Sequence, residues 1–531
     1  MSVSVKRPCE ERAWQRTPSS EAQSGAAPPY GTWLLVAAIV GSSMSFIDGT
    51  AVNVALPVLQ RDLSASSANA QWVVEGYSLF LSALILLGGS FGDRFGRRLV
   101  YAAGIALFAL ASLGCALARS IEWLIVARCM QGVGAALATP GSLALISANF
   151  SGEARGRAIG TWSGFSAITS VIGPVVGGWL VQFGSWRLVF VINLPLAALV
   201  IAILWLRVGE SRDESAPRRV DVLGAALATA GLGALVYGLI RLQGATFDAL
   251  AFVAIGAGCA ALAGFVFAEA HERHPMMRLE LFASRRFSAA NLYTLLLYAA
   301  LGGSLFFVPF DLINVQRYPP AYAGAALLPM IGIMFALSRF SGGLVARIGP
   351  RMPLGIGALL AAAGFAVFAF AGVGGSYWTT FFPGAVMLGL GGAAFVAPLT
   401  TTVLDAVDVS HAGIASGINN AVSRTAGLIA IAALGIALAG TFGASLDRRI
   451  SAERRLTPAS IALLHHDRSR IVAGSIPSDL RSASQRTLVS AAIRHAYAEG
   501  FRTAMLLAAL LALLAAPIAL DPSFAKRVAS R

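Results

Sequence analysis

Long apolar segments alternate with short polar segments along almost the whole chain. Fourteen apolar segments approach or exceed the roughly 20 residues that an α-helix needs to cross a hydrocarbon core about 30 Å thick. A transmembrane β-barrel would instead show segments of about 10 residues with alternating hydrophobicity. The pattern therefore predicts an all-α polytopic membrane protein. The fourteen predicted spans are residues 33–57, 71–92, 99–118, 120–147, 157–182, 188–208, 222–242, 249–270, 287–313, 320–345, 352–374, 379–404, 412–440 and 500–520.

An internal repeat divides these spans into two halves. Residues 89–98 form a glycine-spaced basic turn after the second span, and a similar turn lies 253 positions later at residues 342–351, with Ala346 in place of Asp93. Residues 134–140 in the fourth span likewise resemble residues 392–398 in the twelfth. Spans 1–6 therefore correspond to spans 9–14, and spans 7 and 8 are an insertion. Because eight spans separate the copies, the halves share one topology and are predicted to be related by an axis along the membrane normal.

The repeat predicts the domain organisation. The long segment 441–499, inside the second half, is predicted to be a periplasmic loop that forms a solvated amphipathic cap. The predicted parts are a disordered cytoplasmic tail (1–30), an N-terminal six-helix bundle (31–208), a linker with two inserted transmembrane helices (209–286), a C-terminal six-helix bundle (287–520) and a cytoplasmic tail (521–531).

Charge is scarce and unevenly distributed. Charged residues make up 12% of the chain, against about 25% in soluble domains. The formal net charge of +14 raises the question of a nucleic-acid partner, but 22 of the 40 Lys and Arg residues fall in cytoplasmic segments if the N-terminus is inside, and five fall in short outer loops. This asymmetry is the positive-inside rule. It predicts that both termini are cytoplasmic, and that the partner of the chain is a lipid bilayer and not a nucleic acid.

Enzyme chemistry is not indicated by the sequence. The four cysteines share no metal-ligand spacing, and three of them lie in apolar segments, where they are expected to act as small apolar side chains. Neither a Walker loop nor a nucleophile–base pair occurs in the spans. We therefore expect a protein that is not an enzyme and holds neither a metal nor a cofactor.

Four motifs in the first half resemble those of a known family. They are residues 48–57 in span 1, residues 89–98 after span 2, residues 128–134 in span 4 and residues 173–178 in span 5. On these motifs the chain is identified as a member of the major facilitator superfamily, in its fourteen-span branch of drug:H+ antiporters. The resemblance implies the major facilitator fold, with two six-helix bundles and two inserted helices, in the bacterial plasma (inner) membrane.

The resemblance also implies the function. It implies multidrug efflux, in which hydrophobic or amphiphilic small molecules are exported in exchange for protons by alternating access, so that the proton gradient takes the place of a cofactor. A periplasmic adaptor stays open as a further partner. The alternatives are a dedicated exporter of one endogenous metabolite, an importer, or a transporter-like receptor that binds without translocating.

Three charged residues within spans are candidates for proton coupling: Asp48, Glu75 and Arg128. A charge near the bilayer centre costs on the order of 3 kcal/mol, so each should face the protein interior or a hydrated cavity. All three occupy the outer halves of spans 1, 2 and 4, and we expect them to form one cluster. The resemblance assigns Arg128 to proton transfer. The alternatives are a helix-packing acid bonded to the backbone for Asp48, a purely structural pairing for Arg128 and interfacial exposure for Glu75.

The basic turn is the candidate inner latch, formed by Gly89, Asp93, Arg94, Gly96 and Arg97. Gly96 permits a tight reversal that a bulkier residue cannot adopt. The latch is expected to hold the outward-facing state through a contact of Asp93 with the other half. The alternative is that the basic residues set topology alone.

Small and polar residues in the spans give two further sets. Glycine pairs and a proline in span 5 predict close helix packing and a kink, and the family resemblance adds a seal against ion leakage. Polar residues in spans 1, 4 and 13 either line the substrate cavity or pack between helices. The packing set is Gly173, Pro174, Gly177 and Gly178, and the cavity set is Asn53, Gln131, Asn419, Asn420 and Arg424.

Overall fold

The computed structural model describes residues 30–212, 221–244, 248–272, 275–408, 412–453 and 483–524. The regular elements among these residues are all helices. In the first half they are α1 (Gly31–Asp62), α2 (Ser67–Phe95), α3 (Arg97–Ala116), α4 (Ile121–Asn149), α5 (Gly152–Phe183), α6 (Leu188–Val191) and α7 (Asn193–Arg207). The inserted pair is α8 (Val222–Arg241) and α9 (Ala249–His271). In the second half they are η2 (Leu279–Ala283), α10 (Arg285–Phe310), the π-helical η3 (Asp311–Val315), α11 (Pro320–Ala325), α12 (Leu328–Ile348), α13 (Arg351–Ala369), α14 (Tyr377–Leu404), α15 (Ala412–Ala452), α18 (Ala483–Ala519) and η5 (Pro522–Phe524).

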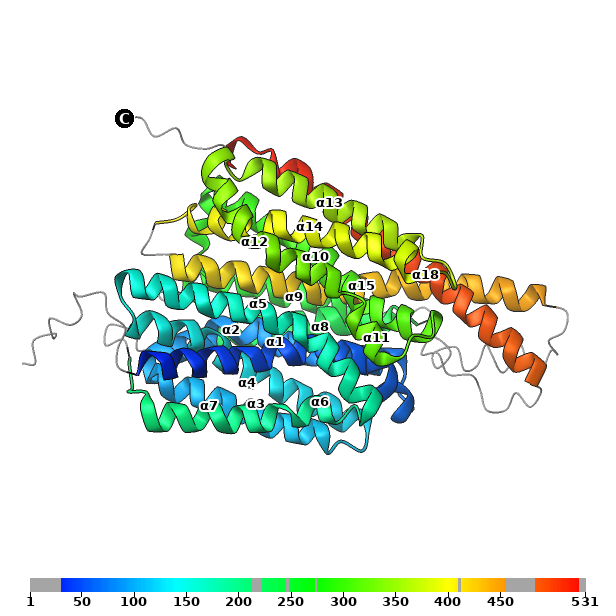
Figure 1. Cartoon of the computed structure of the whole chain (residues 1–531), viewed down its shortest axis with the longest axis horizontal. Coiled ribbons are helices and arrows are strands. Elements are labelled where there is room, and N and C mark those ends of the chain that lie inside the picture. The colour runs from blue at the N-terminus through cyan, green and yellow to red at the C-terminus, as the bar shows by residue number, and fades with distance from the viewer. Residues whose placement is uncertain are drawn as a thin grey trace, which may run out of the picture.

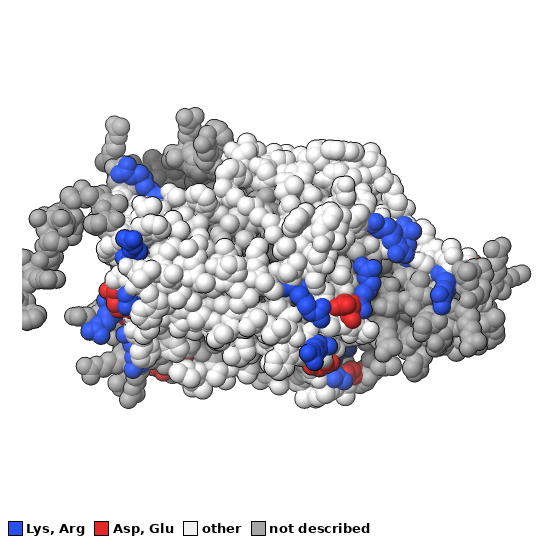
Figure 2. All heavy atoms as spheres, turned by 60° about the horizontal axis from the view of Figure 1, so that its bottom comes forward, with Lys and Arg blue, Asp and Glu red and all other residues white. Residues whose placement is uncertain are grey.

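The helices have the length and composition of membrane spans. Thirteen helical segments among the described residues are long and apolar enough to cross a bilayer, and α5 adds a shorter apolar stretch, Ile172–Phe183. Charged side chains gather near the two ends of the face shown in Figure 2 and leave an uncharged band between them. The chain is therefore a multi-pass membrane protein. Together with α5, the thirteen segments correspond in order to the fourteen predicted spans.

Polar side chains fix where several spans begin. The hydroxyl of Ser66 accepts a hydrogen bond from the backbone N–H of Asn69, and Ser120 and Ser284 act in the same way at the starts of α4 and α10. Asp221 and Asp248 accept from backbone N–H groups at the starts of α8 and α9. Such caps satisfy N–H groups that have no partner within the helix. The short polar loops therefore set the helix boundaries.

The helices pack into two groups. Helices α1 to α7 form the lower part of Figure 1, and helices α10, α12, α13 and α14 lie in its upper part, while α11 reaches down beside α5. The inserted α8 and α9 pack against each other. Helix α8 also contacts α2 from the first group and α15 from the second. Helix α1 begins, and α18 ends, at the same end of the molecule (Figure 1).

The internal repeat is visible in the backbone. Gly96 has a φ of +113°, and Gly349, which lies 253 residues later, has a φ of +78°. Both are in the left-handed region that favours glycine, so the two turns need glycine for the same reason. The duplicated turn is thus a duplicated backbone geometry, even though Asp93 is replaced in the second copy.

Close approach of backbones also recurs in the two halves. A Cβ added at Gly104 on α3 would lie 2.9 Å from the carbonyl oxygen of Gly134 on α4. One added at Gly357 on α13 would lie 3.0 Å from the carbonyl oxygen of Gly391 on α14. Small residues permit this contact in membrane proteins, where helices associate through van der Waals packing. The α3–α4 and α13–α14 pairs are therefore built alike.

The predicted outer segment 441–499 differs from the structure. Helix α15 continues to Ala452 and α18 begins at Ala483, and the two project together beyond the other helices at the right of Figure 1. Buried apolar side chains between them explain the extension, and Arg449 pairs with Glu499 at 2.6 Å. The described parts of this segment are thus extensions of two spans, and residues 454–482 lie outside the described residues. The predicted tail 1–30 lies outside the described residues except for Tyr30, and most of the tail 521–531 lies outside them as well.

The close approach of α3 and α4 generates a stability prediction. Gly104→Ala should lower the free energy of unfolding by about 1–3 kcal/mol, the usual cost of overpacking, because backbone atoms surround the new methyl group. Gly114→Ala, on the same helix, is the matched control, because its Cβ would meet only Ala127 at 3.5 Å. Thermal unfolding of the purified protein measures both variants. Equal midpoints for Gly104→Ala and Gly114→Ala would contradict the packing.

Candidate functional site

Asp48 and Arg128 meet inside the first bundle. Asp48 lies on α1 and Arg128 on α4, and their side chains are 0% and 1% exposed. Nη1 of Arg128 donates to Oδ2 of Asp48. A guanidinium stays protonated in proteins, so its burial requires a counter-charge. The structure thus brings together two of the three residues predicted for proton coupling.

Amide and hydroxyl groups complete this buried network. Nη1 of Arg128 also donates to Oε1 of Gln131 at 2.6 Å, and Nε2 of Gln131 donates to Oδ1 of Asp48 at 2.9 Å. The same Nε2 lies 2.9 Å from Oγ of Ser112 on α3, and Nδ2 of Asn193 on α7 lies 3.3 Å from that hydroxyl. Helices α1, α3, α4 and α7 therefore all contribute to the surroundings of Asp48.

Helix α2 holds the arginine from the other side. Nε of Arg128 donates to the carbonyl oxygen of Val73 at 2.9 Å, and the guanidinium lies 4.3 Å from the centre of the Tyr77 ring. A cation over an aromatic face is stabilised further where water is excluded. The donors of Arg128 are thus directed at acceptors on three helices, which fixes its position.

Glu75 is not part of this network. Its side chain is buried on α2, and Oε1 accepts from Nε2 of Gln71 at 3.4 Å, while Oε2 has no hydrogen-bond partner among the described residues. Oε1 of Gln71 in turn accepts from Gln243, which follows α8 and also donates to the carbonyl oxygen of Ala432 on α15. Glu75 therefore belongs to a second polar cluster, where the inserted helices meet both halves.

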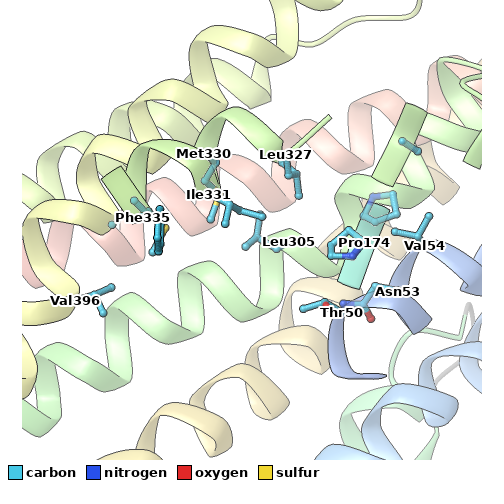
Figure 3. Close-up of a pocket in the computed structure, with 14 residues that line it drawn as sticks. Thr50, Asn53, Val54, Pro174, Leu305, Leu327, Met330, Ile331, Phe335 and Val396 are labelled. Atoms are coloured by element: carbon cyan, nitrogen blue, oxygen red, sulfur yellow. The ribbon is translucent and has the colours of Figure 1, made fainter. Parts of the chain in front are cut away.

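A cavity of about 360 Å³ lies between the two halves. On one side Thr50, Asn53 and Val54 come from α1 and Pro174 comes from α5, as Figure 3 shows. The rest of the wall is apolar and comes from the second half: Leu305, Pro309, Ala323, Leu327, Met330, Ile331, Met334, Phe335, Gly392 and Val396. The volume and the few polar groups fit a drug-sized amphiphilic ligand.

The residues predicted to line the cavity separate into different places. Asn53 does line it, and its Oδ1 is buried without a partner among the described residues. Gln131 belongs to the Asp48 network. Asn419 joins α15 to α10 through Asn291 and Thr294, and Asn420 and Arg424 lie on another face of α15.

The α5 glycines make close contacts with both halves. A Cβ at Gly173 would lie 3.1 Å from the carbonyl oxygen of Ile47 on α1, and one at Gly177 would meet Ala51 on the same helix. A Cβ at Gly178 would lie 2.4 Å from the carbonyl oxygen of Pro320 on α11. The backbone of Pro174 is similarly close to Gly324. These glycines, with Pro174, lie in helix contacts, and α5 joins the halves there.

The predicted latch residues lie together at the α2–α3 turn. Asp93 accepts from Nε of Arg97 at 2.9 Å, and the guanidinium of Arg94 lies 4.8 Å from the centre of the Phe95 ring. Gly89 packs toward Pro140 on α4. The described contacts of Asp93 are thus within its own half.

Glu210, which sequence reasoning missed, fixes this turn. Its carboxylate accepts from the backbone N–H groups of Arg98 and Leu99, each at 3.0 Å. A carboxylate at a helix N-terminus interacts favourably with the helix dipole. A Cβ at Gly96 would lie 2.7 Å from the Glu210 side chain, so glycine also makes room for this cap.

Ser112 and Asn193 were also missed. Asn193 carried a usable signal, because it is an amide within the apolar segment 188–208. Ser112 gave none, since a serine in a span often bonds to its own helix. Among the described residues, no group of three or more His, Cys, Asp and Glu side chains is placed to hold a metal ion.

Comparison with known proteins identifies the family. The Major Facilitator Superfamily family model matches residues 38–431, which is more than half of the chain. The chain belongs to the major facilitator superfamily. The tetracenomycin C resistance and export protein of Streptomyces glaucescens is 34% identical to this superfamily member over 504 residues, covering 93% of this chain and 91% of the relative. The multidrug resistance protein Stp of Mycobacterium tuberculosis is 34% identical over 484 residues, covering 89% and 88%.

A solved transporter structure has the same fold. A bacterial homologue of the human lysosomal transporter Spinster, solved in an inward-facing and occupied conformation, matches with a TM-score of 0.63. Its sequence is 18% identical, and the match covers 93% of this chain and 97% of that one. The major facilitator fold predicted from the sequence is therefore confirmed.

The buried ion pair generates a second stability prediction. Arg128→Ala should lower the free energy of unfolding by about 3–5 kcal/mol, because it leaves the carboxylate of Asp48 buried without its counter-charge. Arg187→Ala is the matched control and should cost about 0–1 kcal/mol, since the Arg187–Asp62 pair is 37% and 49% exposed. Thermal unfolding of the purified variants measures both effects.

A double variant tests whether the lost counter-charge is the cause. Asp48→Asn should recover part of the stability of Arg128→Ala, because it removes the uncompensated charge. A further loss in the double variant, equal to the sum of the two single losses, would argue against a coupled pair.

Proposed function

We propose that this transporter exports hydrophobic or amphiphilic small molecules in exchange for protons. The observation that carries the proposal is the buried network around Asp48, which places one ionisable carboxylate against a permanent cation. The relatives named for tetracenomycin C export and multidrug resistance support export as the direction. The apolar cavity between the halves supports lipophilic molecules as the cargo.

The network offers a mechanism for proton coupling. When Asp48 takes up a proton, it loses its charge and its attraction for Arg128, while the guanidinium keeps its own charge. Arg128 then retains Oε1 of Gln131 and the carbonyl oxygen of Val73 as acceptors. Conformations in which α1, α2 and α4 pack differently then change in relative free energy. A proton on one oxygen thereby shifts the balance between conformations of the first bundle.

The contacts between the halves support alternating access. Beside the α5–α11 contact, the backbone N–H of Ala321 donates to Oε1 of Gln182 at 3.1 Å. With both termini in the cytoplasm of a bacterial cell, as the basic residues favour, this end of α5 faces the exterior. In this topology, the contact between α5 and α11 joins the halves on the outer side. The transporter exchanges protons for a lipophilic molecule, and the lipid bilayer surrounds it.

The α2–α3 turn acts in this scheme as a latch on the cytoplasmic side. In the outward-facing state the two halves close over this side, and Asp93 exchanges its bond with Arg97 for a contact with the second half. Its 44% exposure supports this role, because the carboxylate is available at the surface. Glu210 and Gly96 hold the turn in place while Asp93 changes partner.

The proton role of Asp48 is tested by a charge-neutral substitution. Asp48→Asn should reduce proton-driven accumulation of the neutral dye Nile red in inside-out vesicles to the level of vesicles without the transporter, because the amide cannot take up the proton. Asp62→Asn, at the exposed end of the same helix, should retain accumulation. Gradient-dependent accumulation by Asp48→Asn, at wild-type protein levels, would refute proton coupling through this residue.

The latch is tested separately by Asp93→Asn. This variant should slow the turnover of Nile red by about tenfold, with little change in its KM. The reason is that Asp93 lies at the cytoplasmic turn and not in the cavity. A tenfold effect corresponds to a loss of about 1.4 kcal/mol of stabilisation of the latched state. Initial rates in inside-out vesicles at several dye concentrations give both values. Wild-type turnover would rule the latch out.

A further inference from the structure

Helix α15 carries a polar face in the middle of its span. Gly417, Asn420, Arg424 and Gly427 are spaced by three and four residues, so they share one face of the helix. A Cβ at Gly417 would lie 3.2 Å from Leu86 on α2, and Gly427 packs against Gly302 on α10. Asn420 and Arg424 therefore lie between a contact with the first half and a contact with the second.

This face is open although the neighbouring faces are not. Asn420 is exposed and Arg424 is half-buried, whereas Ala415, Ile418 and Leu428 on the same helix are buried. A charged side chain at this depth is excluded from lipid and faces either protein or a hydrated cavity. Since α15 contacts α2 near Gly417 and α10 near Gly427, Asn420 and Arg424 lie along the seam between the two halves.

Arg424 has no counter-charge within the described structure. None of the described carboxylates pairs with it, and its Nε is buried without a hydrogen-bond partner. Its electrostatic neighbour is the phenol of Tyr77, which also interacts with Arg128. The other central arginine, Arg128, has Asp48 as its counter-charge. The first bundle therefore holds a cation with its counter-charge, and the seam holds a cation without one among the described residues.

The level of the apolar cavity along the helix axes can be compared with that of Arg424. Helices α10 and α15 both run from the cytoplasmic to the outer side under the proposed topology, and Gly302 of α10 meets Gly427 of α15. Arg424 lies one turn to the cytoplasmic side of this contact, and the cavity residue Leu305 lies one turn to the outer side. At 1.5 Å per residue, the two levels differ by about 9 Å along the helix axes. An amphiphile of drug size spans that distance.

We propose that Arg424 binds the anionic group of an amphiphilic substrate, such as a carboxylate, while the apolar part of that substrate occupies the 360 Å³ cavity. The proposal rests on the proposed transport function and adds a substrate class to it. A guanidinium forms two parallel hydrogen bonds with a carboxylate, which a neutral ligand cannot replace. A substrate anion supplies the counter-charge that this part of the chain does not.

Binding to the purified transporter in lipid nanodiscs tests the proposal without a proton gradient. The probes are 1-naphthylacetate and its neutral counterpart 1-naphthylacetamide, which share the same ring system, and calorimetry gives each Kd. The wild type should bind the acid more tightly than the amide. Arg424→Gln should weaken binding of the acid by about 10- to 100-fold, the range expected for a hydrogen bond to a charged group. It should leave binding of the amide unchanged, and Arg424→Lys should restore part of the affinity for the acid.

Two comparisons make the result specific. Arg502→Gln is the matched control, because Arg502 stacks on Phe370 away from the seam and should not change either Kd. Equal weakening of acid and amide in Arg424→Gln, or a wild type that does not bind the acid more tightly than the amide, would overturn the proposal. Because no gradient is applied, a failure of proton coupling at Asp48 leaves this measurement unaffected.

Discussion

The burial of one permanent cation is the constraint on which the first bundle depends. Arg128 cannot lose its proton, so the fold must supply acceptors from every side. Asp48 comes from α1, the carbonyl of Val73 from α2 and Gln131 from α4, while Ser112 and Asn193 support them from α3 and α7. One hydrogen-bond network around Arg128 therefore joins five helices. A network that orders a bundle in this way is also one in which a single proton has structural consequences.

In the second bundle, the repeat positions that correspond to Ser112 and Arg128 are apolar. At the repeat offset of 253 residues Ser112 corresponds to Phe365, and at 258 residues Arg128 corresponds to Val386. Phe365 is fully buried, so packing replaces hydrogen bonding at that position. The backbone features of the repeat persist, as the turn glycines Gly96 and Gly349 show. Duplication thus preserved the scaffold, while the polar network is confined to one copy and most of the apolar cavity wall comes from the other.

Much of this organisation could be predicted from the sequence, because membrane spans and glycine turns are local signals. Apolar length determines a span, and a tight reversal requires glycine at one position, so the order of the helices and the repeat followed from the residues alone. Glu75 shows the limit of this reasoning. Its position within span 2 was predicted, but whether that face of α2 meets Asp48 or Gln243 depends on helix rotation, which sequence position does not specify. Glu210 was missed because its role requires a contact over a separation of more than 100 residues.

The apolar cavity and the charged seam have different consequences for the range of substrates that the transporter can bind. Apolar burial is non-directional, and a hydrophobic wall discriminates between similar molecules by only about 1–3 kcal/mol per methylene group. The wall formed by Met330, Ile331 and Phe335 therefore suits many lipophilic shapes. Discrimination must come from the few polar groups at its margin, where an unmet hydrogen bond or charge costs more than a lost methylene contact. Asn53 at the cavity and Arg424 at the seam each have a buried polar atom without a hydrogen-bond partner among the described residues. Under the proposed mode of binding, these two side chains are the ones that favour one substrate chemistry over another.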